Sequence, residues 1–373
     1  MFIEIGDKTS RLLDVLRGVA ALLVVAGHSR DYAAKIFKLS PTGDSLFEKI
    51  LLVPTSFAME SVAVFFVLSG FLVGGQTIKL VNKDQFIWSD FFAKRISRLW
   101  VVLVPGIILT WFVWEINFYL WEVSTRSPSL DAAVCNLFFF QESQCDSFSI
   151  NVALWSLSYE FWFYIVFAGI ATFVGHCYRK KFPYAIVSLL VAFISVAAFG
   201  LNLLFFMPSW LIGVFIYWFY AKNKEVHTFI YENNYYWLIF SIVLITVFAL
   251  CSAFFSWNKI TLTTLMAFPS AIFVYVTLHV RNEPNFLTKL IDIGVYVGHR
   301  SFSIYVFHMP IVIFVLYCMR ELYIGQDVSL PILTYTTIII SAPISILLWY
   351  VTEKHTPFFR EKFLLIASKS KNF

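Results

Sequence analysis

The chain has 373 residues, of which 59% are hydrophobic and 14% charged, against about 25% charged residues in ordinary soluble domains. A soluble protein of this length could not bury so much apolar surface, so the composition excludes a soluble enzyme, a disordered chain and a disulfide-rich scaffold. It favours an all-α polytopic transmembrane helical bundle. The net charge of +5 accompanies no basic–aromatic RNA motif and no zinc-binding cysteine spacing, so we expect neither a nucleic-acid partner nor a bound metal.

Ten apolar segments, taken in chain order, predict ten membrane-spanning helices. They cover residues 11–30, 55–77, 96–121, 151–175, 184–200, 202–220, 236–255, 260–280, 301–319 and 330–351. Segments 184–200 and 202–220 are the weakest, and one alternative is a hairpin that enters the membrane only partway. The first segment follows basic residues closely enough that a cleaved signal peptide is a second alternative.

The placement of the basic residues predicts the orientation of the chain. With both termini in the cytoplasm, 21 of the 28 Lys and Arg fall in cytoplasmic segments, as the positive-inside rule requires. We therefore expect one transmembrane domain over residues 1–352 and a short cytoplasmic tail over 353–373. Loops 31–54 and 122–150 then lie outside, and loop 281–300 lies inside, where a short interfacial helix fits.

Two cysteines, Cys135 and Cys145, share the outer loop 122–150. A disulfide between them is compatible with an oxidising periplasm. A helix-compatible segment between them instead favours two free thiols, so both states stay open with free thiols preferred.

Polar residues at membrane depth are costly and indicate function. Arg17 and His28 are eleven residues apart on the first helix, which places them on one face and about 16 Å apart along the axis. Asp14 shares this face, one turn before Arg17. The alternative for this stripe is that Arg17 snorkels to the inner headgroups and His28 caps the outer end of the helix.

The second and third helices add further candidates. Glu60 lies in the outer part of the second helix, and Ser69 and Gly70 follow it as small residues that also suit close helix packing. Arg95 and Arg98, at the cytoplasmic start of the third helix, suit a phosphate group. Their alternative role is a positive-inside anchor.

The fourth and ninth segments carry Glu160 and His308. A carboxylate at this depth needs a partner or a proton, and one alternative for Glu160 is a neutral side chain hydrogen-bonded between helices. His308 by itself is better interpreted as a hydrogen-bonded core histidine.

Five motifs occur in order at compatible depths: Arg17-x10-His28, Phe65-Phe66-x-x-Ser69-Gly70, Arg95-x-x-Arg98, Trp155-Ser-Leu-x-x-Glu160 and Ser301-Phe-Ser-Ile-Tyr-x-x-His308. Together they resemble the acyltransferase-3 family of integral membrane acyltransferases, which O-acetylate surface polysaccharides. The resemblance covers about residues 12–351. Phe302 departs from the tyrosine that is common at its position. Many relatives carry a fused hydrolase-like domain, and we expect none here.

The resemblance implies acetyl-CoA as a cytoplasmic donor co-substrate, no tightly bound cofactor, and a hydroxyl acceptor on an extracytoplasmic or lipid-linked sugar. It implies a catalytic histidine at His28 and CoA contacts from the arginines. We expect His28 to act as the general base, with Glu160, in preference to Glu60, fixing its tautomer. Direct transfer and a covalent acetyl-histidine relay both remain open.

The other motif residues are expected to support the site. Ser69 and Gly70 are candidates for cofactor contacts, and Ser69, Ser156 and Tyr159 are candidate oxyanion donors. The expected substrate or structural supports are Asp14, Trp155, Ser156, Tyr159, Ser301, Tyr305 and His308.

Two other functions compete with an acyltransferase of a bacterial inner membrane. A transporter or flippase for a lipid-linked saccharide would also place charges near the midplane, but the sequence has no inverted repeat. A structural membrane subunit would leave the polar stripe unexplained. Dependence on acyl-CoA separates the enzyme from the transporter.

Overall fold

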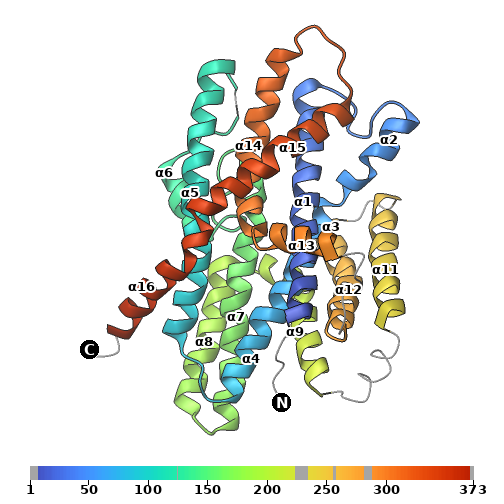
Figure 1. Cartoon of the computed structure of the whole chain (residues 1–373). Helices are drawn as coiled ribbons and strands as arrows, with labels where there is room; N and C mark the ends of the chain where they lie inside the picture. Colours follow the sequence, from blue (N-terminus) through green and yellow to red (C-terminus); the bar gives the residue numbers. More distant parts are fainter. Residues whose placement is uncertain (1–6, 124, 223–233, 255–257, 281–287, 370–373) are drawn as a thin grey trace. The chain divides into compact units, whose positions relative to one another are not determined.

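The computed structural model describes residues 7–123, 125–222, 234–254, 258–280 and 288–369, and in this part of the chain every long element is a helix (Figure 1). The helices are α1 (Asp7–Phe37), α2 (Leu46–Leu52), α3 (Ala58–Ser69), α4 (Gly75–Asn82), α5 (Trp88–Trp121), α6 (Leu130–Leu137), α7 (Trp155–Tyr178), α8 (Phe182–Phe199), α9 (Asn202–Lys222), α11 (Asn234–Phe254), α12 (Lys259–Thr277), α13 (Thr288–Gly298), α14 (Ser301–Leu322), α15 (Leu330–Val351) and α16 (Thr356–Lys369).

The ten predicted segments coincide with helices. Within the described residues nine helical stretches are long and apolar enough to cross a membrane. The remaining predicted segment is α11, whose described apolar stretch Tyr236–Cys251 is shorter. Both α8 and α9, the weakest predictions, have the length and hydropathy of full spans. The all-α fold is therefore confirmed, and the chain is a multi-pass membrane protein.

Two compact units make up the chain. Unit 1 comprises Met1–Gly18, Met59–Phe86 and Tyr159–Gly298, and unit 2 comprises Val19–Ala58, Ile87–Ser158 and His299–Phe373.

Unit 1 is built around the contact of α9 with the segment that follows α3. That segment, Gly70–Gly74, is a π-helical turn between α3 and α4. A Cβ on Gly70 would lie 1.9 Å from the carbonyl oxygen of Trp210, and a Cβ on Gly213 would lie 2.0 Å from that of Val67. The two glycines thus let the backbones touch, as small residues do between membrane helices. Helix α12 also packs on α9 and contacts α11.

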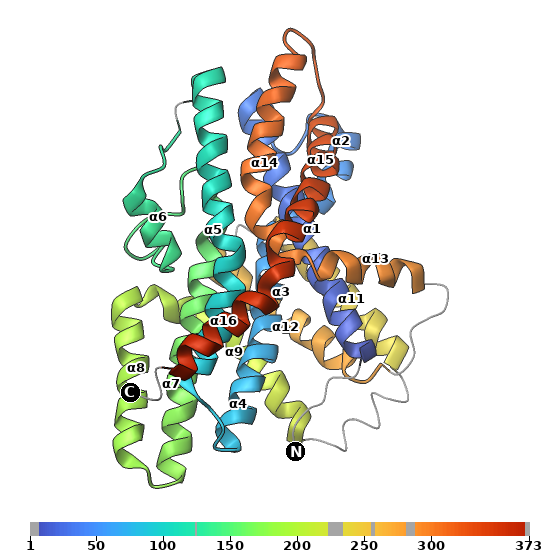
Figure 2. The same ribbon diagram turned by 60° about the vertical axis from the view of Figure 1, so that its left-hand side comes forward.

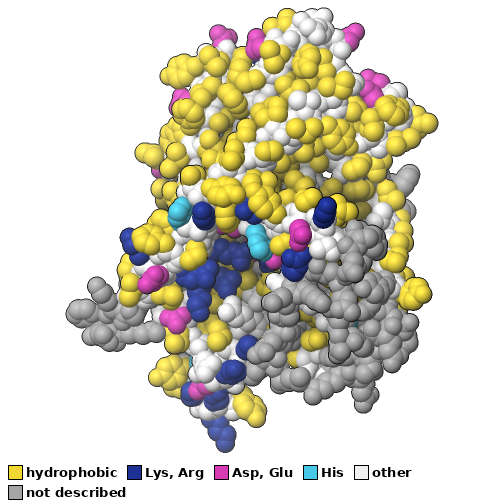
Figure 3. All heavy atoms as spheres, in the orientation of Figure 1, with side chains coloured by type: hydrophobic (Ala, Val, Ile, Leu, Met, Phe, Trp, Pro, Cys, Tyr) yellow, Lys and Arg dark blue, Asp and Glu magenta, His cyan; other side chains and the backbone are white. Residues whose placement is uncertain are grey.

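Unit 2 is built around α14, which packs on both α5 and α15. A Cβ on Gly106 of α5 would lie 2.4 Å from Cγ1 of Val306, so this glycine sets the close approach of α5 and α14. Figure 3 shows hydrophobic side chains over the outer surface of α14, α15 and α2. An apolar surface of this extent fits contact with lipid.

Several predicted boundaries differ from the structure. Helix α1 continues to Phe37, seven residues beyond the predicted end, because residues 31–37 contain no glycine or proline and bury Ala33 and Ala34. Loop 281–300 contains α13, which confirms the predicted short helix. The predicted tail 353–373 contains α16, which packs on α5, with the rings of Trp100 and Phe363 6.4 Å apart.

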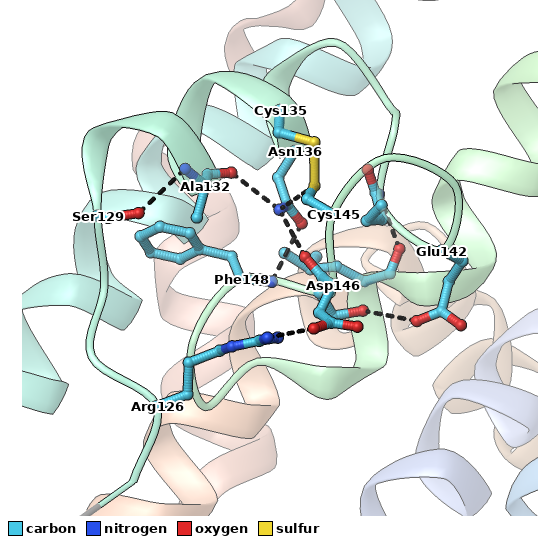
Figure 4. The surroundings of a disulfide bond; sticks show 12 residues. Arg126, Ser129, Ala132, Cys135, Asn136, Glu142, Cys145, Asp146 and Phe148 are labelled. Carbon is cyan, nitrogen blue, oxygen red and sulfur yellow. Dashed lines mark hydrogen bonds and ion pairs between the residues drawn. A yellow bond between two sulfur atoms is a disulfide. The ribbon is translucent and has the colours of Figure 1, made fainter. Parts of the chain in front are cut away.

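The preference for two free thiols is wrong, because Cys135 and Cys145 form a disulfide (Figure 4). Helix α6 ends at Leu137, and positive φ angles at Phe139 and Glu142 then turn the chain back. Asn136 fixes this loop, since its side chain donates to the carbonyls of Ala132 and Asp146 and accepts from the Phe148 N–H. Figure 2 shows α6 and this loop beside α5.

Candidate functional site

Two histidines of unit 2 stack on each other. His28 lies on α1 and His308 on α14, with ring centroids 5.3 Å apart and ring planes 29° apart. His308 is fully buried, whereas His28 is half-buried. No hydrogen bond joins the His28 ring to another described residue of unit 2. Two residues that the sequence placed on separate helices therefore form one pair.

The backbone of α14 holds the His308 ring. Its Nδ1 lies 2.7 Å from the carbonyl oxygen of Tyr305 and 3.1 Å from that of Ile304. A carbonyl oxygen only accepts hydrogen bonds, so in the neutral ring Nδ1 carries the hydrogen and Nε2 carries the lone pair. Nε2 is buried and has no hydrogen-bond partner among the described residues of unit 2. His308 is thus a buried histidine with hydrogen bonds at Nδ1, as the interpretation of a core histidine expects, and Nε2 is the nitrogen that this interpretation does not account for.

Asn151 supports the same stretch of α14 and was missed from the sequence. Pro310 has no N–H, so the carbonyl of Val306 lacks its usual helical donor. The Asn151 side chain supplies one, with Nδ2 3.0 Å from the Val306 oxygen and 3.3 Å from Oγ1 of Thr110. The proline in the sequence signals a freed carbonyl, but nothing in the sequence indicates which residue satisfies it.

Two of the predicted support residues meet one turn before His308. The hydroxyls of Ser156 and Tyr305 are 2.7 Å apart, and Tyr305 also donates to the carbonyl of Ala153 at 2.6 Å. These bonds join the start of α7 to α14. Trp155 and Ser301 are buried at the first residues of α7 and α14, and their role as supports stays a prediction.

A second polar cluster lies within unit 1, around Glu160. Tyr164, one turn along α7, donates its hydroxyl hydrogen to Glu160. The same hydroxyl is 3.1 Å from Oγ of Ser69, which accepts from Nε1 of Trp210 at 3.2 Å. Ser69 and Glu160 are thus linked through Tyr164, a residue that the sequence did not single out.

Other predicted residues of unit 1 have the following surroundings. Glu60 is buried on α3. Asp14 and Arg17 form an ion pair at 3.0 Å, which confirms that they share a helix face. Tyr159 lies against the rings of Phe163, Phe199 and Phe206, and Gly70 serves the backbone contact with Trp210 described above.

The two arginines of the third motif lie near the start of α5, in unit 2. Arg98 is exposed and Arg95 half-buried. Figure 3 shows Lys and Arg side chains gathered on the face over α16 and the lower part of α5. On α16, Lys362 is exposed and Arg360 half-buried. A cationic face of this kind can bind an anionic ligand or anionic lipid headgroups.

A family model described as an acyltransferase domain matches residues 11–351. An O-acetyl transferase of Shigella phage Sf6 is 30% identical over 220 residues, which cover 54% of this chain and 58% of that protein. An uncharacterised protein of Haemophilus influenzae is 25% identical over 141 residues, covering 36% of this chain and 58% of that protein.

The chain thus spans somewhat less than three-fifths of the length of these curated relatives. No solved structure matches it. The family match, in contrast, includes all five motifs and both histidines of the pair. The chain therefore belongs to the acyltransferase-3 family.

Proposed function

We propose that this protein is an O-acetyltransferase of a bacterial inner membrane. It moves an acetyl group from cytoplasmic acetyl-CoA to a hydroxyl of a lipid-linked or polymeric surface carbohydrate. The family match and the similarity to a phage O-acetyl transferase support this reaction class. The observation that carries the proposal is the half-buried His28 ring, stacked on a buried histidine between membrane helices.

In the proposed reaction, His28 takes the proton of the acceptor hydroxyl as the oxygen attacks the acetyl carbonyl. The new C–O bond forms, the C–S bond breaks, and the thiolate of CoA takes the proton back from the His28 imidazolium. The products are the acetyl ester and free CoA. A ring without a competing hydrogen bond in unit 2 suits this role, because its nitrogen is available to substrate.

Carboxylates complete the proposed proton-transfer site. Glu160 fixes the tautomer of His28 and stabilises its cationic form, as carboxylates do for other catalytic histidines, and Glu60 is the second candidate. The bond from Tyr164 supports a functional Glu160, because it orients the carboxylate. Either glutamate would have to be ionised to stabilise the imidazolium.

The basic residues are proposed to bind the donor. Arg95 and Arg98 contact the phosphates of CoA, and Arg17 guides the pantetheine arm along α1. The gathering of cationic side chains over α5 and α16 supports a polyanionic ligand on this face. Ser69 and Gly70 are proposed to contact the same arm.

Purified full-length protein in nanodiscs tests the proposal. The assay supplies acetyl-CoA and de-O-acetylated surface polysaccharide from the source strain, and it measures both free CoA and polysaccharide-bound acetyl. We expect both products to form in equal amounts, and only when both substrates are present. A protein that forms no acetyl ester, but moves lipid-linked saccharide across the membrane without acetyl-CoA, would be a flippase instead.

A further inference from the structure

The mechanism above gives no role to the buried histidine beside His28. Nε2 of His308 has no hydrogen-bond partner in its unit, although the residue is fully buried. An unpaired buried acceptor is unfavourable, so a structure that keeps one beside His28 requires an explanation. A ligand that pairs with Nε2 when it binds would supply it.

The tautomer of His308 restricts what that ligand can be. Because the two carbonyls of α14 hold the hydrogen on Nδ1, Nε2 can only accept. Its ligand must therefore present a donor such as a hydroxyl or an amide N–H. The oxygen of a thioester and the oxygens of an ionised phosphate do not qualify.

His28 is not that donor in this structure, because Nε2 of His308 has no hydrogen-bond partner in unit 2. The lone pair and the N–H groups of an imidazole lie in the plane of its ring. The ring centroids are 5.3 Å apart and the ring planes 29° apart, so the two imidazoles are close enough for one small ligand to contact both. Two donors on one substrate, each about 2.8 Å from its nitrogen, can engage the two rings together.

We propose that Nε2 of His308 accepts a hydrogen bond from a second hydroxyl of the acceptor sugar, next to the hydroxyl that His28 deprotonates. This inference rests on the proposed function and adds a specificity-determining residue to it. Neighbouring hydroxyls of a sugar ring are close enough for one to reach each imidazole. The enzyme then selects acceptors with a free hydroxyl beside the site of acetylation.

Two substitutions of His308 test the roles of its two ring nitrogens separately. His308→Asn keeps a donor near the position of Nδ1 but removes the acceptor at Nε2, whereas His308→Gln can place an amide oxygen near Nε2. The assay is the nanodisc reaction with acetyl-CoA and de-O-acetylated polysaccharide, with each substrate varied in turn. We expect His308→Asn to raise the KM for polysaccharide about five- to tenfold, the loss of one neutral hydrogen bond. The KM for acetyl-CoA should stay unchanged, and His308→Gln should recover most of the effect.

His279 supplies a matched control. It is a buried histidine two residues after the end of α12, and its Nδ1 also lies on a carbonyl four residues earlier, that of Tyr275 at 2.9 Å. His279→Asn should leave both KM values unchanged. Equal impairment in His308→Asn and His308→Gln, or a rise in the KM for acetyl-CoA instead, would overturn the inference. Loss of all transfer in the wild type would instead refute the proposed function, and this inference with it.

Discussion

Asn151 compensates for a hydrogen bond that Pro310 removes from α14. The proline removes the backbone donor that Val306 would otherwise receive, and Asn151 supplies a side-chain donor in its place. Because His308 lies between Val306 and Pro310 on α14, this bond also holds the stretch that presents its ring. Asn151 lies six residues after Cys145, so the segment that follows the disulfide helps to position the histidine pair.

Asn151→Ala should lower stability by about 1–3 kcal/mol, the cost of a buried carbonyl left unpaired. Pro310→Ala restores a backbone N–H, so it should recover part of this loss when the two are combined. Thermal unfolding of the four proteins in detergent measures the coupling. Asn117 is the control, because it is buried on α5 and its side chain lacks a hydrogen bond among the described residues. Additive losses in the Asn151→Ala, Pro310→Ala double variant, or an equal recovery for Asn117→Ala, would contradict the pairing.

Tyr164 is expected to matter through Glu160. Tyr164→Phe removes one hydroxyl without changing the ring, so the carboxylate loses a donor and its fixed orientation. We expect kcat for acetyl transfer to fall about tenfold or more, with little change in unfolding temperature. Tyr178→Phe makes the same substitution at an exposed position of the same helix and should have no effect. Full activity of Tyr164→Phe would show that this bond is not used.

Among single residues, the sequence predicted those whose polarity contrasts with the apolar segment around them. A charged or imidazole side chain in an apolar segment is conspicuous, so the sequence indicated Asp14 and Arg17 as one stripe. It indicated His28 and His308 separately and did not predict that they form a pair. Asn151 and Tyr164 carry no such signal, since one follows a loop and the other lies in an aromatic helix. The roles predicted for His28, Glu160 and Glu60 stay predictions.

Among the elements, the loop closed by the Cys135–Cys145 disulfide bears most directly on the orientation of the chain in the membrane. A disulfide persists in an oxidising compartment, so the bond between Cys135 and Cys145 agrees with the outer placement of loop 122–150. The sequence left this pair undecided, because residues 136–144 can be read as helix. The turn after Leu137, with two residues at positive φ, decides it.

This placement predicts a specific labelling pattern in intact cells with the outer membrane permeabilised. A membrane-impermeant maleimide should label neither Cys135 nor Cys145 until an impermeant reductant is added. Cys135→Ser alone should expose Cys145 to the reagent without reduction. The double Cys135→Ser, Cys145→Ser variant should lose about 2–3 kcal/mol of stability, the entropy of closing a short loop. Labelling of Cys145 in the single variant only after cell lysis would place this loop in the cytoplasm.

Over the whole molecule, hydropathy predicted the membrane-spanning helices but not where α1 ends or how α16 packs. Composition and apolar runs correctly indicated an all-α membrane protein, because span length is set by bilayer thickness. Neither the extension of α1 to Phe37 nor the packing of α16 on α5 was foreseen. Such ends depend on contacts with other parts of the chain, as the rings of Trp100 and Phe363 illustrate. The cytoplasmic position of both termini stays a prediction from the basic residues.

The central claim is that His28 carries an acetyl transfer to a surface carbohydrate. The most direct test is the O-acetyl content of that carbohydrate, measured by proton NMR in a deletion strain complemented with wild type or His28→Ala. Immunoblots of membrane fractions establish equal expression. We predict that acetyl signals return with the wild type only, and that the shifted ring protons identify the acceptor hydroxyl. Normal acetylation by His28→Ala, at equal expression, would contradict the account.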